Sequence, residues 1–525
     1  MKKLAFISFI FILITLVACS GQSNESEGNT ATEQASGGDL VVDLTSAPVS
    51  LDPHAANDGN SLYVMSAIYD TLVFLDKDLT LKPGLAESYE QIEDTVWELK
   101  LRQGIEFHDG TPFNAEVVKV NFDRIFDKDV ASPVGFLFDM VTNVEVIDEY
   151  TVHIETEFPF VALPAHLAHP AGHMISKEAI EADYEAMENG APPFAYVNEN
   201  PIGTGYFKYE SSVPGENVTL TKNEDYWDIE ANVDKVTFKV VPEDLTRIAE
   251  LQTEEADIIY PVNPNDINQL ENTDGTVVQQ SDSSNLTYIG FNLEVEPFND
   301  KRVRHAITMA IDKEELIDGI VDGVALPAQG FLAPTVYGYS DDITPLTYNV
   351  EEAKSLLEEA GYADGFQATI LTTDLRSNIN IAEYAQAQLA PLGIDLSIQI
   401  AEQGAYLDAT AKGNHQLFVG SWGTVTLDAD YGLYGMFHSS NVGAPGNRSF
   451  IQNDDVDALL EAGRKEMDEA TRLELYKEVQ QLLVDEAPLV PVYHSILLTG
   501  LRDNVEGYFQ YPSSFLFLRD VELKE

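Results

Sequence analysis

Three histidines are the side chains in this sequence whose spacing most resembles a metal site. His166, His169 and His173 lie three and four residues apart, the spacing that places ligands on one face of a helix. Pro170 and Gly172 fall between them and would break such a helix. We therefore predict that these histidines bind no metal.

The sequence also lacks recognisable catalytic motifs. It contains no Gly-x-Ser-x-Gly elbow, no phosphate-binding loop and no EF-hand calcium loop. Paired carboxylates of the kind that glycosidases use are common, but the chain has 88 Asp and Glu residues, so such pairs arise by chance. We predict that the chain is not an enzyme and that it holds no cofactor. An acid-rich exported hydrolase is the alternative from a different class.

The charge balance excludes one class of partner. Against 88 acidic residues stand 30 basic ones, which gives a formal net charge of −58. Nucleic-acid binding needs a basic surface, so no nucleic-acid partner is expected. The acids are spread along the chain and are typical of a solvated surface. With 525 residues, of which 44% are hydrophobic, the chain is long enough for two or more domains.

The N-terminus has the features of an export signal. Lys2 and Lys3 precede an apolar run at residues 4–17, which is too short to span a membrane. Cys19 follows shortly after this run, and residues 16–19 resemble the lipobox that bacterial lipoprotein signal peptidase reads. We predict a signal peptide at residues 1–18 and a lipid anchor on Cys19, at the extracellular face of the cell membrane.

Two further conclusions follow from this region. Cys19 is the only cysteine, so neither a disulfide nor a thiolate metal cluster can form within the chain. Residues 19–38 are rich in Ser, Gly, Glu, Asn and Thr and contain no aromatic residue, which predicts a flexible tether. Folded structure should begin near Asp39.

The rest of the chain alternates strand and helix patterns. Apolar and polar residues alternate at 96–101, 236–240 and 394–400, which predicts strands. Asn349 with Glu352 predicts a capping box, and Gly361 predicts the end of that helix. Further predictions are a turn at 108–110, a helix capped by Asn114, and helices at residues 379–390, 454–465 and 469–485. The pattern indicates an α/β protein.

Several motifs, occurring in the same order, resemble one protein family. They cover nearly the whole chain from Asp39 onward, and together they are specific although each alone is weak. The chain resembles family 5 of the bacterial extracellular solute-binding proteins, which includes dipeptide, oligopeptide, glutathione and nickel binders. The runs that carry the resemblance are residues 81–89, 97–116, 201–207, 226–227, 297–306, 310–312, 348–365, 420–437 and 486–493.

The resemblance implies a two-lobed periplasmic-binding-protein-like fold with the ligand cleft between the lobes. The first lobe would comprise residues 39–285 and 497–525, with an inserted subdomain at 61–192. The second lobe would comprise residues 286–496. It also implies a monomer that captures its solute by hinge closure and delivers it to the permease subunits of an ABC importer.

Residues 420–434 contain the principal candidates for ligand contact. In peptide-binding relatives a tryptophan, here matched by Trp422, is followed three residues later by an aspartate that pairs with the α-ammonium of the peptide. In this chain that position is Val425. The resemblance therefore shifts the candidate anchors to Asp428 and Asp430, as in the glutathione-binding subgroup, and makes Trp422 a candidate wall of the pocket.

Three further residues complete the candidate site by resemblance. Arg376 lies near the position where dipeptide-binding relatives carry an arginine for the ligand carboxylate, and Asn57 and Asp58 fall where relatives line the cleft. The favoured ligand is a short peptide or a glutathione-like peptide. A chelated nickel complex is the alternative within the family.

Overall fold

The computed structural model describes residues 37–444 and 446–524. The predicted signal peptide at 1–18, Cys19 and nearly all of the predicted tether at 19–38 lie outside these residues. Strand β1 begins at Asp39. In the part of the chain that is described, no helix combines the length and the apolar character needed to cross a membrane.

One large mixed sheet forms the framework of the molecule. Strand β14 runs parallel to β15 and β16, and β1 runs parallel to β10 and β11. The central strands β12 and β17 pair in antiparallel fashion. In spatial order the strands are β15 (Asp395–Ala401), β14 (Gln367–Thr373), β16 (Leu417–Gly423), β12 (Thr276–Phe291), β17 (Leu489–Arg502), β11 (Ile258–Ile259), β1 (Asp39–Leu44), β10 (Lys235–Val240), β9 (Asn217–Lys222) and β8 (Phe207–Val213), and β13 (Ala325–Pro327) also pairs with β17.

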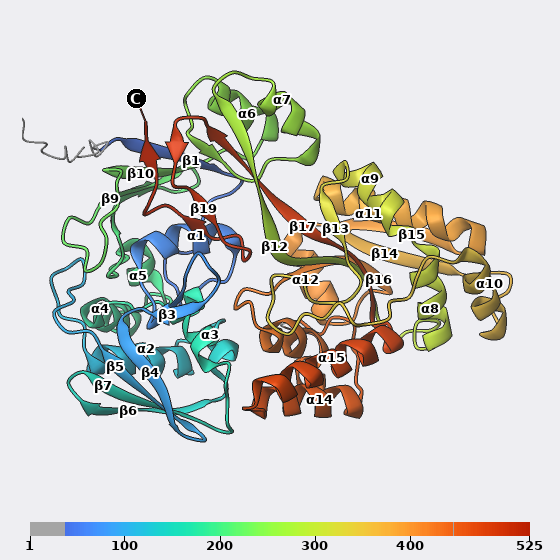
Figure 1. Cartoon of the computed structure of the whole chain (residues 1–525), viewed down its shortest axis with the longest axis horizontal. Coiled ribbons are helices and arrows are strands. Elements are labelled where there is room, and N and C mark those ends of the chain that lie inside the picture. Colours follow the sequence, from blue (N-terminus) through green and yellow to red (C-terminus); the bar gives the residue numbers. More distant parts are fainter. Residues whose placement is uncertain (1–36, 445, 525) are drawn as a thin grey trace, which may run out of the picture. The chain divides into compact units, whose positions relative to one another are not determined.

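The two longest strands, β12 and β17, join the two halves of this sheet (Figure 1). The second half of β12 pairs with β16, and the end of β17 pairs with β11. The register between β12 and β17 shifts after Asp282 and again after Thr287, so the ladder is irregular where the strands pass from one half to the other.

Smaller sheets lie outside this framework. A four-stranded antiparallel sheet has the order β4 (Ala86–Glu93), β5 (Val96–Leu101), β7 (Thr151–Thr156) and β6 (Val141–Asp148). The remaining pairs are β2 (Val73–Leu75) with β3 (Leu81–Pro83), β18 (Val505–Glu506) with β21 (Glu522–Leu523), and β19 (Phe509–Gln510) with β20 (Leu516–Phe517).

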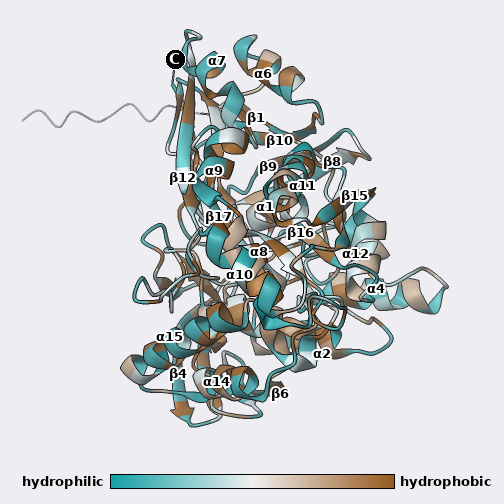
Figure 2. Ribbon diagram, turned by 90° about the vertical axis from the view of Figure 1, so that its right-hand side faces the viewer, coloured by the Kyte–Doolittle hydropathy of each residue, from teal (hydrophilic) through white to brown (hydrophobic). Residues whose placement is uncertain are grey.

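The peripheral helices mix hydrophilic and hydrophobic residues, because one face of each packs inward (Figure 2). The α-helices are α1 (Gly59–Ile68), α2 (Ala115–Phe126), α3 (Leu163–Leu167), α4 (Lys177–Glu188), α5 (Ala195–Glu199), α6 (Asp244–Gln252), α7 (Ile267–Glu271), α8 (Lys301–Ala310), α9 (Lys313–Val321), α10 (Val350–Glu359), α11 (Arg376–Leu389), α12 (Gln403–Ala411), α13 (Gly435–Phe437), α14 (Asp454–Lys465) and α15 (Glu469–Glu486). Short helical turns include η2 (Pro170–Gly172) and the π-helical turn η5 (Asp430–Tyr434).

The buried apolar residues form separate cores. One draws on residues 40–260 and 497–521, and two others draw on residues 286–493. A further core comprises residues 72–174 together with Tyr431, which comes from far later in the chain. The lobe boundaries stay a prediction, but the loop that contains Tyr431 docks on the core of residues 72–174.

Most predicted elements are present, and their ends follow local chemistry. Strand β5 and helix α14 have the predicted limits. Asn349 caps α10 by accepting a hydrogen bond from the backbone N–H of Glu352. A capping box also needs the side chain of Glu352 to accept the backbone N–H of Asn349. That part of the prediction is wrong, because this N–H donates to the carbonyl of Met309 at 2.8 Å. Helix α11 begins at Arg376, three residues before the predicted start.

Candidate functional site

The segment of residues 420–434, here called the site loop, leaves the large sheet at the end of β16. Pairing with β12 places Trp422 opposite Leu286. The backbone N–H of Thr424 then donates to the carbonyl of Ser284. Leu427 adopts a φ of 54°, which is unusual for a residue with a branched side chain and turns the chain sharply. The loop ends in the π-helical turn η5, a form of helix that often occurs at functional sites.

Aromatic rings connect the site loop to the core of residues 72–174. The rings of Trp422 and Tyr431 stack with their centroids 5.6 Å apart, and His169 lies 6.0 Å from Tyr431. Trp422 and Val425 pack against the same core. The indole Nε1 of Trp422 is buried without a hydrogen-bond partner among the described residues. The predicted pocket-wall residue therefore presents an unused donor.

The carboxylate of Asp428 is fully engaged within the protein. Arg472, on α15, donates to both of its oxygens at 2.7 and 2.9 Å, and both side chains are buried. One of these oxygens also accepts the backbone N–H of Asp430 at 2.8 Å. Burial lowers the pKa of Arg472, but the charge of Asp428 outweighs this effect and raises it overall. A ligand amine could reach Asp428 only by competing with Arg472.

Asp430 has a different environment, although it is also buried beside an arginine. Its Oδ1 lies 3.0 Å from Nε of Arg464, yet neither atom makes a hydrogen bond to another described residue. Its Oδ2 lies 3.5 Å from Nε2 of His166. Burial raises the pKa of Asp430, but Arg464 and His166 outweigh this effect, so the pKa is lowered overall. The carboxylate is charged and incompletely bonded.

Arg464 bridges the site loop and the segment of residues 136–173. Its guanidinium lies 3.9 Å from the ring centroid of Tyr434 and just over 5 Å from those of Phe158 and Phe160. Its Nη2 lies 3.7 Å from Oδ1 of Asp139. These rings exclude water, which strengthens the attraction between Arg464 and nearby anions.

Trp422, Asp430 and Arg464 lie around a cavity of about 40 Å³, here called the small cavity. His166 donates from Nδ1 to the carbonyl of Leu137 at 2.7 Å. A buried acid, an arginine and an indole donor in one cavity are complementary to a small ionic group. The lining residues are Phe136, Leu137, Asp139, His166, Trp422, Asp430, Tyr431, Tyr434, Gly435, Asn441 and Arg464.

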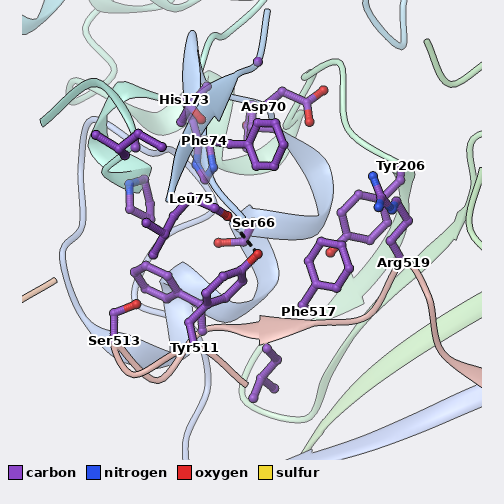
Figure 3. A pocket seen from close by; sticks show the side chains of 18 of the residues that line it. Ser66, Asp70, Phe74, Leu75, His173, Tyr206, Tyr511, Ser513, Phe517 and Arg519 are labelled. Carbon is purple, nitrogen blue, oxygen red and sulfur yellow. Dashed lines mark hydrogen bonds between the residues drawn. The ribbon is translucent and has the colours of Figure 1, made fainter. Parts of the chain in front are cut away.

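A larger cavity of about 140 Å³, here called the large cavity, lies against the other part of the site loop (Figure 3). Val425 and Thr426 of the loop form part of its wall. The rest of its wall is rich in aromatic rings and comprises Ser66, Tyr69, Asp70, Thr71, Phe74, Leu75, Leu81, Gly84, Ala165, Ala168, Pro170, His173, Tyr206, Tyr226, Trp227, Asp228, Tyr511, Ser513, Phe515, Leu516, Phe517 and Arg519.

The three histidines considered as metal ligands have separate roles. Burial lowers the pKa of His169 and of His173 to about 3, so both rings are neutral near pH 7. His169 accepts the backbone N–H of Ala171, while His166 faces Asp430. Within residues 37–444 and 446–524, no group of three or more His, Cys, Asp or Glu side chains could hold a metal ion.

The remaining predicted site residues, Asn57, Asp58 and Arg376, are not among the residues that line the small or the large cavity. Asn57 is exposed and lies near the phenol of Tyr431; burial raises the pKa of that phenol to about 12, and Asn57 opposes this effect. Asp58 is the N-cap of α1 and accepts bonds from the backbone N–H and the hydroxyl of Ser61. Arg376 is exposed at the start of α11, where its charge lowers the pKa of Asp266 against the larger effect of burial.

The structure thus brings together Trp422, Asp430 and, through Tyr431, Asn57. It adds Arg464 and Asp139, which sequence reasoning missed, and gives His166 a place beside Asp430. No local signal could have revealed this set, because its members lie on segments that are far apart in the sequence and meet only through tertiary packing.

Comparison with known proteins places this geometry in a family. A model described as "Bacterial extracellular solute-binding proteins, family 5 Middle" matches residues 80–444. The chain is 32% identical over 495 residues to the glutathione-binding protein GsiB of Salmonella typhi, covering 93% of this chain and 94% of that protein.

Solved structures agree with this result. The periplasmic binding protein DppA of Helicobacter pylori, in complex with the peptide STSA, superimposes with a TM-score of 0.84 at 30% identity, covering 94% of this chain and 99% of that chain. The oligopeptide-binding protein AppA of Bacillus subtilis, in complex with a nonapeptide, gives a TM-score of 0.81 at 26% identity, covering 94% and 100%. These relatives are two-lobed α/β binding proteins and not enzymes. The chain belongs to family 5 of the bacterial extracellular solute-binding proteins.

Proposed function

We propose that this chain is the substrate-binding lipoprotein of an ABC importer and that it captures a short peptide or a glutathione-like peptide. The relatives support this ligand class, since GsiB is a glutathione-binding protein and the DppA and AppA structures contain peptides. In this proposal the first lobe comprises residues 39–285 and 497–525, and the second comprises residues 286–496. The lipid on Cys19 holds the receptor at the extracellular face of the membrane.

The observation that carries the proposal is the set of incompletely bonded polar atoms at the small cavity. A peptide has an α-ammonium and a carboxylate, and each needs a buried partner of opposite charge. Asp430 is the candidate partner for the ammonium, because Asp428 is already paired with Arg472. The Nε atoms of Arg464 and Trp422 are candidate donors to an anionic group of the ligand. Arg376 remains the alternative carboxylate partner.

Ligand capture would involve closure of the two lobes. A solute that contacts both lobes binds the closed state better and shifts the population toward it. Strands β12 and β17 pass between the halves of the large sheet and are the proposed hinge. Hinge closure of periplasmic binding proteins is a known mode of domain motion. X-ray scattering should give a smaller radius of gyration with saturating ligand, and an unchanged radius would contradict closure.

Native mass spectrometry of the purified protein tests the ligand class directly, because a ligand bound in the cell remains bound in the instrument. A released mass matching a short peptide or glutathione supports the proposal. A nickel chelate, or no binding of peptides in calorimetric titrations, contradicts it. If a supplied peptide is recovered cleaved after long incubation, in proportion to the protein added, the exported-hydrolase alternative is correct.

The lipid anchor needs its own test. Cells that produce the parent protein should retain it in the membrane fraction and incorporate labelled palmitate into it. The Cys19→Ser variant should lose both properties, because the thiol is the acceptor of the lipid. Release of the parent protein into the soluble fraction would contradict the anchor without affecting the proposed ligand.

A further inference from the structure

The large cavity is built by segments from distant parts of the sequence. The end of α1 and the hairpin of β2 and β3 supply one wall, and residues 511–519 supply another (Figure 3). Tyr511 joins these two walls by donating its hydroxyl to the carbonyl of Leu75 at 2.9 Å. The site loop contributes Val425 and Thr426, so a ligand bound against that loop lies next to this cavity.

The size of the cavity matches one aromatic ring. A cavity of about 150 Å³ in another protein holds a benzene molecule, and the volume here is about 140 Å³. Rings dominate the wall, and aromatic rings pack favourably against one another in edge-to-face and offset geometries. An aliphatic methyl group would leave most of this volume unfilled.

The polar atoms of the cavity indicate that its occupant is not purely apolar. His173 is 5% exposed, and its Nδ1 has no hydrogen-bond partner among the described residues, which is also true of Oγ of Ser513. Asp70, by contrast, accepts hydrogen bonds from Thr204, Tyr226 and Trp227 at 2.8 to 3.0 Å. The acid is therefore satisfied by the protein, whereas His173 and Ser513 have capacity to spare.

We propose that the large cavity accepts an aromatic side chain of the bound peptide, one that carries a hydrogen-bonding group such as a phenol or an indole. This inference rests on the proposed function for the peptide itself, and it narrows the ligand class. Glutathione has no aromatic side chain, so it would leave the cavity unfilled. The receptor would prefer a peptide with tyrosine or tryptophan.

Titration calorimetry with three tripeptides tests the preference. We expect Ala-Tyr-Ala to bind at least about tenfold more tightly than Ala-Ala-Ala, because burial of the ring adds a large apolar area to the contact. Ala-Phe-Ala should fall between them. Ala168→Phe fills the cavity and should remove the preference, so that Ala-Tyr-Ala and Ala-Ala-Ala bind this variant with equal affinity. Equal affinities in the parent protein, or a preference that survives in this variant, would overturn the proposal.

Further variants make the result specific. His173→Phe keeps the ring stacked on Tyr69, whose centroid lies 5.8 Å away, but removes Nδ1. Combined with Ser513→Ala, it should abolish the advantage of Ala-Tyr-Ala over Ala-Phe-Ala, and an unchanged advantage would overturn the polar part of the proposal. Val425→Phe fills the cavity from the site loop if Ala168→Phe fails to fold. Leu326→Phe, at an exposed position, is the control for added ring volume.

A probe without a peptide backbone separates this inference from the proposed function. p-Cresol has the ring and hydroxyl of tyrosine, and its binding can be measured by saturation-transfer NMR. Binding to the parent protein that is lost in Ala168→Phe supports the cavity assignment even if no tripeptide binds. No binding of p-cresol to the parent protein, or equal binding to both proteins, overturns the assignment.

Discussion

Two aspartates of the site loop, Asp428 and Asp430, each lie beside a buried arginine, yet their environments differ. Asp428 and Arg472 form two hydrogen bonds, at 2.7 and 2.9 Å, and the pair is complete. Asp430 and Arg464 approach to 3.0 Å without hydrogen-bonding geometry, neither atom of that contact has another described partner, and both residues line the small cavity. The first pair has no bonding capacity left for a ligand, whereas the second pair has.

This difference separates a structural role from a binding role for residues of the same type in the same loop. A buried charge costs several kcal/mol to desolvate unless its partners satisfy it. The complete pair between the site loop and α15 meets that requirement within the protein. The incomplete pair retains an unmet requirement that an ionic group of a ligand can satisfy when it binds.

The largest expected effect is a loss of protein stability when the complete pair of Asp428 and Arg472 is broken. Arg472→Met leaves Asp428 buried and unpaired, and should lower the free energy of unfolding by about 3–5 kcal/mol. Urea denaturation measures this change. Lys477→Met, which breaks a partly exposed pair with Asp342, is the control and should cost less than about 1 kcal/mol. Similar values for the two variants would contradict the structural role of Arg472.

The next effect is on ligand affinity at the incomplete pair. Asp430→Asn removes the charge that we assign to the ligand ammonium, and should weaken binding of the co-purified ligand by at least about tenfold. Its free energy of unfolding should change less than that of Arg472→Met. Calorimetry measures the affinity, and Asp454→Asn on the surface of α14 is the control. Unchanged affinity would show that the anchor lies elsewhere.

A smaller effect is expected from the indole donor of the small cavity. Trp422→Phe keeps a ring against Tyr431 but removes Nε1, so ligand affinity should fall by about two- to tenfold, the usual effect of one hydrogen bond. Trp97 provides a matched control, because its Nε1 is also buried without a described partner but it lines neither the small nor the large cavity. Trp97→Phe should leave the affinity unchanged; an equal loss in both variants would argue for a general packing effect.

The smallest effect is a pH dependence. Because the folded-state pKa of Asp430 lies below its ordinary value of 3.8, its charge contributes stability above that pH and loses the contribution as the pH falls through the folded-state pKa. The difference in unfolding free energy between the parent protein and Asp430→Asn should therefore shrink as the pH falls from 5 toward 2. A constant difference over this range would show that the carboxylate gains nothing from Arg464.

The sequence predicted those elements whose ends depend on neighbouring residues. Asn349 and Asn114 cap their helices as predicted, because a side chain and a nearby backbone N–H are enough to define the start. The start of helix α11 at Arg376 was not predicted, because Leu375 has no side chain that can cap a helix and the sequence therefore contains no signal for that boundary.

The candidate site was predicted less well, for a related reason. The site loop was identified by its resemblance to the family, and Trp422 and Asp430 do line one cavity. Which aspartate is already paired depends on Arg472 and Arg464, which lie on other helices. The two cavities depend on packing among segments far apart in sequence. Neither periodicity nor spacing contains that information.

The contact between Tyr511 and Leu75 also has a consequence for folding during synthesis of the protein. A ribosome makes the chain from its N-terminus, so Leu75 is synthesised long before its partner Tyr511. Strand β11, in the middle of the large sheet, likewise pairs with β17, which is synthesised much later. Pairings this distant in sequence slow folding, because a long loop must close before they stabilise the chain. The large cavity therefore cannot form on a nascent chain, and only a completed polypeptide can hold a ligand there.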